Sequence, residues 1–252
     1  MRIHLLACRV LTRELSYYAA KSPQTVDITW LPQGLHDTPD RLRSMLQSAI
    51  QGLEADIDNG LIKHQPDTIV LGYGLCSNGV VGLQAGRYPL VVPRTDDCIA
   101  LFLGSQSRYL ELFAKRPGTF WLNNGWIESA YLPMPEVLEQ KRAEYAQRYG
   151  EDNAQFLIEQ DMLWMEHYQA CGYIRSPRLE RDRDAQTAKR LAQDAGWRYF
   201  MVDGSERLLE KMVRGEWNEE EFLFCPPGFQ IEAAYDGSKI KAANPGREKV
   251  AL

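Results

Sequence analysis

Thr68-Ile69-Val70-Leu71-Gly72-Tyr73-Gly74-Leu75-Cys76 begins as a short apolar run and ends in a turn that contains glycine and cysteine. Apolar runs of this length are typical of strands covered on both faces, as in a parallel sheet. Ile3 to Cys8 has the same apolar character, and Val26 to Leu31 and Tyr88 to Val92 are predicted to be further strands. Because parallel neighbours are joined by crossovers and not by tight hairpins, this half of the chain indicates a parallel α/β sheet.

A helix is predicted to connect the second and third of these strands. Thr38-Pro39-Asp40 provides a cap residue and a proline at the first helical position, both typical of a helix start. Apolar residues then recur with helical spacing at Leu42, Met45, Leu46, Ala49, Ile50 and Leu53. This spacing predicts that one face of the helix is buried.

The second half of the chain resumes the alternation of strands and helices. Its predicted strands are Thr119 to Leu122, Gly172 to Arg175, Trp197 to Val202 and Glu221 to Cys225. Residues 135–170 are predicted to form a long, charged helical segment. We therefore expect an α/β protein with parallel sheets and Rossmann-like βα units in two halves, residues 1–130 and 131–252, joined by this helical middle segment. The basic tail, Ser238 to Leu252, is expected to be loosely held or to clasp a neighbour.

The composition narrows the class of protein. The 252 residues include 29 Lys and Arg and 34 Asp and Glu, which gives a formal charge of −5, so we expect no nucleic-acid partner. With 44% hydrophobic residues and a mean hydropathy of −0.39, the chain is expected to be a folded soluble protein. No apolar run reaches the ~20 residues of a membrane helix. Arg9, Arg13 and Glu14 interrupt the apolar start, so we expect a cytoplasmic protein without a signal peptide.

Five cysteines in such a chain favour free thiols, metal ligands or redox chemistry over structural disulfides. Cys8 ends the first predicted strand, Cys76 follows the third, and Cys98 follows the fourth. Ligands of open parallel sheets bind beyond the carboxyl ends of the strands, so these three thiols are candidate ligands of one metal site. The alternative is that each cysteine is a small buried side chain, and Cys171 and Cys225 are weaker candidates.

The residues next to two of these thiols include further candidate site groups. Gly74 and Asn78 belong to a glycine-rich turn whose amide groups can face an anion or the sulfurs of a cofactor. Arg94 can bind an anionic substrate through charge-assisted hydrogen bonds. Asp97 can transfer protons in a reaction, or it can cap the helix that follows.

Other candidates come from segments remote in the sequence. His36, near a helix start, can act as a general acid or base or as a ligand. Trp126 is the preferred wall of a cofactor-binding pocket, because it follows an Asn-Asn-Gly turn. Tyr73, Tyr109 and Trp121 could line the same pocket, although aromatic residues more often pack in cores and interfaces.

Several short motifs occur along most of the chain. They are Cys8, His36-Asp37, Tyr73-Gly74-Leu75-Cys76, Pro93-Arg94 with Asp97-Cys98, Leu103-Gly104-Ser105, Gly125-Trp126, Gly215-Glu216-Trp217 and Pro227-Gly228. Together they resemble the uncharacterised proteins grouped as domain of unknown function 1638. Ser77-Asn78 departs from the Gly-Asn expected at that place, and this departure does not touch the thiols. Members of the family occur mainly in anaerobic archaea and bacteria, often near corrinoid-dependent methyl-transfer systems. The resemblance therefore implies one-carbon or metal chemistry, with Cys8, Cys76 and Cys98 as the site.

Three thiolates suit two kinds of metal centre. They leave one position open on a tetrahedral zinc ion, or they leave the fourth iron of a [4Fe-4S] cluster open to substrate. The anaerobic setting that the resemblance implies and the glycine-rich turn favour the iron-sulfur cluster, with zinc second.

The leading hypothesis is a metal-dependent lyase or transferase that acts on a small anionic molecule by lyase, sulfur-transfer or methyl-transfer chemistry. A second hypothesis is a non-catalytic metal- or corrinoid-binding accessory protein of a methyltransferase system, in which a corrinoid enters only through the protein partner. A third is a metal-free enzyme with a cysteine nucleophile. The sequence leaves the oligomeric state open, a homo-oligomer included.

Overall fold

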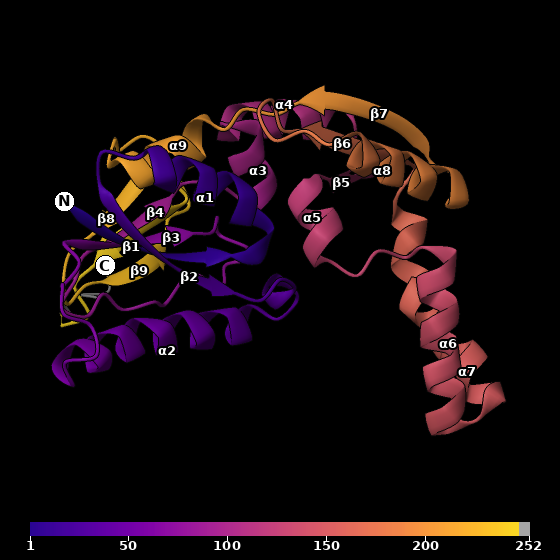
Figure 1. The fold of residues 1–252 in the computed structure, drawn as a ribbon, viewed down its shortest axis with the longest axis horizontal. Helices are drawn as coiled ribbons and strands as arrows, with labels where there is room; N and C mark the ends of the chain where they lie inside the picture. The colour runs from indigo at the N-terminus through magenta and orange to yellow at the C-terminus, as the bar shows by residue number, and fades with distance from the viewer. Residues whose placement is uncertain (247–252) are drawn as a thin grey trace. The chain divides into compact units, whose positions relative to one another are not determined.

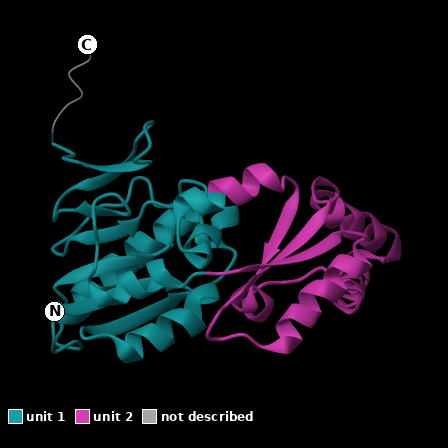
Figure 2. Ribbon diagram, turned by 90° about the horizontal axis from the view of Figure 1, so that it is seen from above, with its two compact units in different colours: residues 1–109, 205–252 teal, residues 110–204 magenta. Residues whose placement is uncertain are grey.

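The computed structural model describes residues 1–246 and contains two compact units. Unit 1 consists of Met1–Tyr109 and Ser205–Leu252, and unit 2 consists of Leu110–Gly204 (Figure 1 and Figure 2). Each unit has its own sheet and its own hydrophobic core. Helix α4 (Gln106–Lys115) contains the point at which the chain passes from unit 1 into unit 2.

Unit 1 combines a five-stranded sheet, its flanking helices and a small hairpin. In chain order its elements are β1 (Arg2–Cys8), η1 (Arg9–Leu11), α1 (Thr12–Lys21), β2 (Thr25–Leu31), η2 (Leu35–Asp37), α2 (Pro39–Asp58), β3 (Thr68–Gly72), β4 (Leu90–Pro93), α3 (Cys98–Leu103), α9 (Arg207–Arg214), β8 (Phe222–Cys225), β9 (Gln230–Ala233) and β10 (Ile240–Ala243). The strand order of the sheet is β2-β1-β3-β4-β8. The first four strands are parallel, whereas β8 runs antiparallel to β4. β9 and β10 form a separate antiparallel pair.

The centre of this sheet is covered on both faces. All residues of β3 are buried, which is why this strand is apolar without alternation. In β1, Ile3 pairs with Val26 on one side and with Thr68 on the other. Helix α2 runs along one face of the sheet, while α1 and α9 lie along the other (Figure 1).

Helix α2 follows the predicted apolar pattern. Its buried residues are Leu42, Leu46, Ile50, Leu53 and Ile57, all at helical spacing. Pro39 occupies the first turn as expected, but the side chain of Thr38 makes no capping hydrogen bond. Burial of one apolar face is therefore what holds this helix in place.

Unit 2 contains a three-stranded parallel sheet and a helical hairpin. Its elements are β5 (Thr119–Leu122), α5 (Asn124–Ser129), α6 (Pro135–Tyr149), α7 (Glu151–Met162), η3 (Leu163–His167), β6 (Ala170–Arg175), α8 (Asp182–Asp194) and β7 (Arg198–Asp203). The strand order is β5-β6-β7, and both pairings are parallel. A Cβ at Gly172 would lie 2.8 Å from the Trp121 ring, so glycine lets the indole pack directly on β6.

The structure confirms the α/β class and the parallel βα units of both halves, and it differs from the expectations at three places. The strand Glu221 to Cys225 was expected in the second sheet, but β8 pairs antiparallel with β4. The compact units therefore do not follow a division at residue 130, because the chain returns to the first sheet after residue 204. The tail was expected to be loosely held or to clasp a neighbour, but part of it forms β10, which pairs with β9. Residues 247–252 lie outside the described part of the chain.

Among residues 1–246, no helix has both the length and the apolar content that a membrane crossing requires.

Glu221 ties α9 to the beginning of β8. Its carboxylate accepts hydrogen bonds from Arg207, from Lys211 (2.5 Å) and from Asn218 (2.9 Å). Burial alone would raise the pKa of Glu221, but these hydrogen bonds outweigh it and lower the pKa to about 2. The ionised form of Glu221 is therefore favoured more strongly in the folded chain than in the unfolded one.

We expect Glu221→Gln to lower the free energy of unfolding at neutral pH by about 1–3 kcal/mol, because it removes the acceptor of charge-assisted hydrogen bonds. Because the pKa of Glu221 is lower in the folded chain, its carboxylate stabilises the fold at pH values above 4.5, the pKa in the unfolded chain. This stabilisation is lost as the pH falls towards about 2. Urea unfolding of both proteins over this pH range measures the difference, which should shrink in acid. Glu220→Gln, which removes an exposed neighbouring carboxylate, is the matched control. A difference that does not depend on pH would contradict this role.

Candidate functional site

Three thiols lie at the carboxyl edge of the parallel strands in unit 1. Cys8 is the last residue of β1, Cys76 lies in the turn that follows β3, and Cys98 is the first residue of α3 after β4. Since β1, β3 and β4 are adjacent and parallel, their carboxyl ends meet at one edge. Cys76 is buried, whereas Cys8 and Cys98 are partly exposed.

Tyr73 lies among these three thiols. Burial is the largest cause that raises the pKa of its phenol far above the ordinary value, and the charges of Cys8, Cys76 and Cys98 raise it further. All three thiols therefore act electrostatically on this hydroxyl. The hydroxyl approaches the Cys8 thiol, but it has no well-formed hydrogen bond with any of residues 1–246. The sequence pointed to Tyr73 only as a pocket wall, whereas the fold makes it the shared neighbour of the thiols.

Backbone amide groups face the sulfur of Cys76. The amides of Gly74 and Cys98 donate toward it and act against the rise in its pKa. The amide of Val10 acts in the same way on the Cys8 sulfur. Hydrogen bonds from amides to sulfur are a common feature of thiolates that bind metal clusters, because they stabilise the negative charge.

The turn after β3 is hydrogen-bonded to the loop after β4. The amide of Leu75 donates to the carbonyl of Thr95, and the amide of Cys76 donates to the carbonyl of Asp96, both at 2.8 Å. These two bonds bring Cys76 next to the loop that leads to Cys98.

The backbone of this turn is strained. Cys76, Ser77 and Asn78 all have positive φ angles, of 46°, 58° and 64°. Left-handed backbone is unfavourable for residues other than glycine, and such strain clusters at functional sites. Asn78 itself is exposed, so its structural contribution here is through its backbone conformation.

Gly74 permits the contact between the turn and the loop. A Cβ at this position would lie 2.7 Å from the amide nitrogen of Asp97 and from the carbonyl oxygen of Thr95. Both atoms belong to backbone that cannot move without breaking the two hydrogen bonds of the turn. The sequence prediction that Gly74 belongs to the site thus has a steric reason.

Gly74→Ala is expected to destabilise the protein by about 1–3 kcal/mol, because its methyl group overpacks the contact between the turn and the loop. Gly52→Ala is the matched control, since its Cβ would meet no atom within 4 Å in helix α2. There alanine should be neutral or stabilising by up to about 1 kcal/mol. Thermal or urea unfolding measures both variants. Equal stability of Gly74→Ala and the wild type would show that the contact is not tight.

The thiols of Cys8 and Cys76 are protonated when no cation is near. Burial is the main cause that raises the pKa of Cys8 and of Cys76, and the charge of Asp97 adds to the effect at Cys76. A positively charged centre would reverse this balance and favour thiolates.

Asp97 caps helix α3. Its Oδ1 accepts hydrogen bonds from the amides of Ile99 (2.8 Å) and Ala100 (3.3 Å), and its Oδ2 accepts one from the Tyr109 hydroxyl (3.1 Å). Burial raises the pKa of Asp97, although these hydrogen bonds oppose the rise. The capping alternative expected from the sequence is therefore present, and the carboxylate also lies beside Cys76 and Cys98.

Arg94 and Lys239 connect the C-terminal hairpin to this loop. The guanidinium of Arg94 donates to the carbonyls of Glu219 (2.9 Å), Ser238 (2.7 Å) and Ile240. Lys239 forms an ion pair with Asp96 at 2.5 Å. Sequence reasoning missed these contacts because the tail carries no local signal of pairing with a loop more than a hundred residues away.

The other predicted residues belong to other elements of the fold. His36 lies in η2, with its Nε2 3.2 Å from the carboxylate of Asp37. Trp126 belongs to unit 2, where its amide donates to the side chain of Asn123. Cys225 and Cys171 are fully buried in the cores of unit 1 and unit 2, and burial raises their pKa to about 11 and about 12. These two cysteines act as small core side chains.

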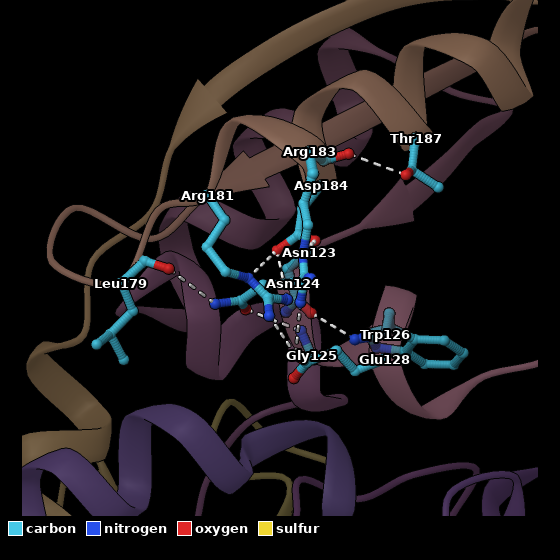
Figure 3. A network of polar contacts seen from close by, with 10 residues as sticks. All are labelled: Asn123, Asn124, Gly125, Trp126, Glu128, Leu179, Arg181, Arg183, Asp184 and Thr187. Atoms are coloured by element: carbon cyan, nitrogen blue, oxygen red, sulfur yellow. Dashed lines mark hydrogen bonds and ion pairs between the residues drawn. The ribbon is translucent and has the colours of Figure 1, made fainter.

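Unit 2 has a polar network at the carboxyl edge of its own sheet (Figure 3). Arg181 bridges Glu128 of α5 (2.5 Å) and Asp184 of α8 (2.6 Å), and Arg183 lies within 3.9 Å of both carboxylates. The charges of these four side chains compensate one another, so the network joins α5 to α8.

A single metal ion does not fit the described donors as they stand. Among residues 1–246, no group of three or more His, Cys, Asp or Glu side chains is arranged to hold one ion. The charges of Cys8, Cys76 and Cys98 nevertheless all act on the phenol of Tyr73.

Comparison with known proteins identifies a family. The family model described as Protein of unknown function (DUF1638) matches residues 30–213 and confirms the resemblance of the motifs. The match contains Cys76 and Cys98, whereas Cys8 and the C-terminal hairpin lie outside it. No curated protein and no solved structure matches the chain significantly.

Proposed function

The chain belongs to the DUF1638 family, whose function is unknown, and from its thiol site we propose that it is a metal-dependent enzyme acting on a small anionic molecule. In this proposal Cys8, Cys76 and Cys98 hold an iron-sulfur cluster, and one iron stays open to substrate. Zinc on the same thiols is the second candidate. Lyase, sulfur-transfer and methyl-transfer reactions all suit an open coordination position next to buried thiols.

The observation that carries the proposal is the convergence of three thiols from separate segments on one buried phenol. Cysteines that were only small core side chains would have no reason to share an edge of the sheet and a common neighbour. The amides that face the sulfurs of Cys8 and Cys76 give a second argument, because they stabilise thiolates and not thiols.

A cluster and a single ion require different arrangements of three thiolates. Three thiolates that bind one zinc ion must all lie at bonding distance from the same point. Thiolates that bind a cubane each contact a different iron, so they stand farther apart and surround a larger volume. Because the described donors are not arranged to hold one ion, the cluster is the first candidate in this proposal.

The protein's own groups have distinct tasks around such a centre. A bound cluster with an open iron supplies a Lewis acid for a donor atom of the substrate. Tyr73 offers a hydroxyl donor to the sulfurs or to the substrate. Asp97 holds the start of α3, and with it Cys98, through its capping bonds. A carboxyl with a raised pKa at this place can also exchange a proton with the substrate.

Arg94 supports the choice of an anionic substrate. Its hydrogen bonds go to backbone carbonyls and not to carboxylates, so no ion pair neutralises its charge within the described residues. Its pKa is lowered by partial burial, but an arginine keeps its charge at any physiological pH. In this proposal Arg94, in the loop that leads to Cys98, contributes positive charge to the binding of the anion, in competition with the nearby carboxylates of Asp236 and Glu219.

Iron and acid-labile sulfide analysis, together with a visible spectrum, tests the proposal on protein purified without oxygen. We expect about four irons and four sulfides per chain for a cubane. The triple variant Cys8→Ala, Cys76→Ala, Cys98→Ala should contain none. The double variant Cys171→Ala, Cys225→Ala removes two buried thiols outside the site and should keep the full content.

Each outcome of this experiment has a definite meaning. One zinc per chain, lost in the triple variant, would overturn the cluster and support the second candidate. Metal that is absent from the wild type, or that remains in the triple variant, would overturn the proposal. Circular dichroism of all three proteins checks that they are folded.

Tyr73→Phe separates the role of the phenol from that of the thiols. We expect this variant to keep its iron, because the three cysteines remain. Its reduction potential should fall, because the loss of a hydroxyl donor near the sulfurs makes an added electron less stable. Potentiometric titration followed by visible absorption measures the change. An unchanged potential would mean that the hydroxyl does not interact with the cluster.

A further inference from the structure

Four aromatic rings gather at the amino edge of the sheet in unit 2, and the thiol site uses none of them. Phe120 of β5 lies 5.4 Å from Trp164, 5.4 Å from Tyr168 and 5.7 Å from Trp197, measured between ring centroids. Tyr168 in turn lies 5.7 Å from Trp164 and 5.8 Å from Trp197. All four rings are partly exposed, so the group is not a closed core.

An open cavity of about 430 Å³ lies against this group. Tyr168 and Trp197 form its aromatic walls, with their ring planes inclined at 52° to each other. Met165 and Glu166 of η3 also line it. Phe120 packs against the rings of both walls, Tyr168 and Trp197.

The charge in this cavity is negative and uncompensated. Glu166 is exposed, and it forms no ion pair with any described basic side chain. It is also the only charged residue among those that line the cavity within the described chain. The faces of aromatic rings carry a negative potential as well, so rings and carboxylate attract the same kind of ligand.

Basic side chains of the protein cover other rings but not these. Lys21 lies 4.3 Å above Tyr17, and Arg116 lies 4.0 Å above Phe200. In the part of the chain that the structure describes, no lysine or arginine lies over Tyr168 or Trp197. No described basic side chain therefore competes with an outside cation for these two rings.

We propose that this cavity binds a small organic ammonium ion that carries methyl or other short alkyl groups on its nitrogen. The alkyl groups bury apolar surface against the indole and the phenol, while the charge interacts with both rings and with Glu166. A hydrated metal ion would gain little from such walls, because they offer one carboxylate and otherwise few oxygen ligands.

Titration with choline tests the proposal on the full-length protein. The indole N–H signals of Trp197 and Trp164 in ¹H–¹⁵N NMR spectra report binding, with saturation in the millimolar range or below. The neutral isostere 3,3-dimethylbutan-1-ol has the same shape without the charge. It should bind more weakly by about two- to fivefold or more, which is the contribution of an exposed cation–π contact.

Variants locate the site. Trp197→Leu removes one wall and should abolish saturable binding, while Glu166→Gln should weaken choline binding by at least about twofold without changing the affinity for the isostere. Glu144→Gln is the matched control, because it removes an exposed carboxylate of the same unit outside the cavity. Glu166 is exposed, so its variant should fold even if Trp197→Leu does not.

The opposite results would overturn the proposal. Equal binding of choline and its neutral isostere would show an apolar hollow without preference for cations. Indole signals that do not change with choline, or an effect of Glu144→Gln as large as that of Glu166→Gln, would show that the rings serve only to pack unit 2.

Discussion

The close approach between the turn after β3 and the loop after β4 is the constraint on which the thiol site depends. Two backbone hydrogen bonds hold the turn against the loop, and only glycine at position 74 leaves room for them. The same contact brings Cys76 beside the segment that leads to Cys98 and directs the amides of Gly74 and Cys98 at one sulfur. The strained backbone of residues 76–78 accompanies this arrangement.

The last part of the chain completes this edge of unit 1. β8 adds an antiparallel strand beside β4, and the hairpin β9–β10 supplies the carbonyls that bind Arg94 and the lysine that pairs with Asp96. The loop before Cys98 is thus held on one side by β3 and on the other by residues far away in sequence. A site that needs thiols at fixed places benefits from support on both sides.

The two units use the edges of their parallel sheets differently. In unit 1 the carboxyl edge carries thiols, a phenol and strained backbone. In unit 2 the carboxyl edge carries Asn123, which caps α5, and Arg181, which pairs with Glu128 of α5 and Asp184 of α8 and so joins the two helices. The amino edge of unit 2 instead carries partly exposed rings beside Glu166, which has no ion pair within residues 1–246. Similar βα units therefore present different chemistry because their loops differ.

The sequence alone was enough to predict β1 to β8, the amphipathic face of α2 and the positions of Cys8, Cys76 and Cys98 at strand ends, since apolar periodicity and turn residues are local properties. It did not predict β9 and β10. It also indicated Gly74 and the capping role of Asp97, although not the steric reason for the glycine. Only the tertiary structure decided that β8 joins the first sheet, that Tyr73 lies among the thiols and that Arg94 binds the hairpin. These features depend on contacts between segments remote in sequence, and such contacts leave no periodic pattern in either segment.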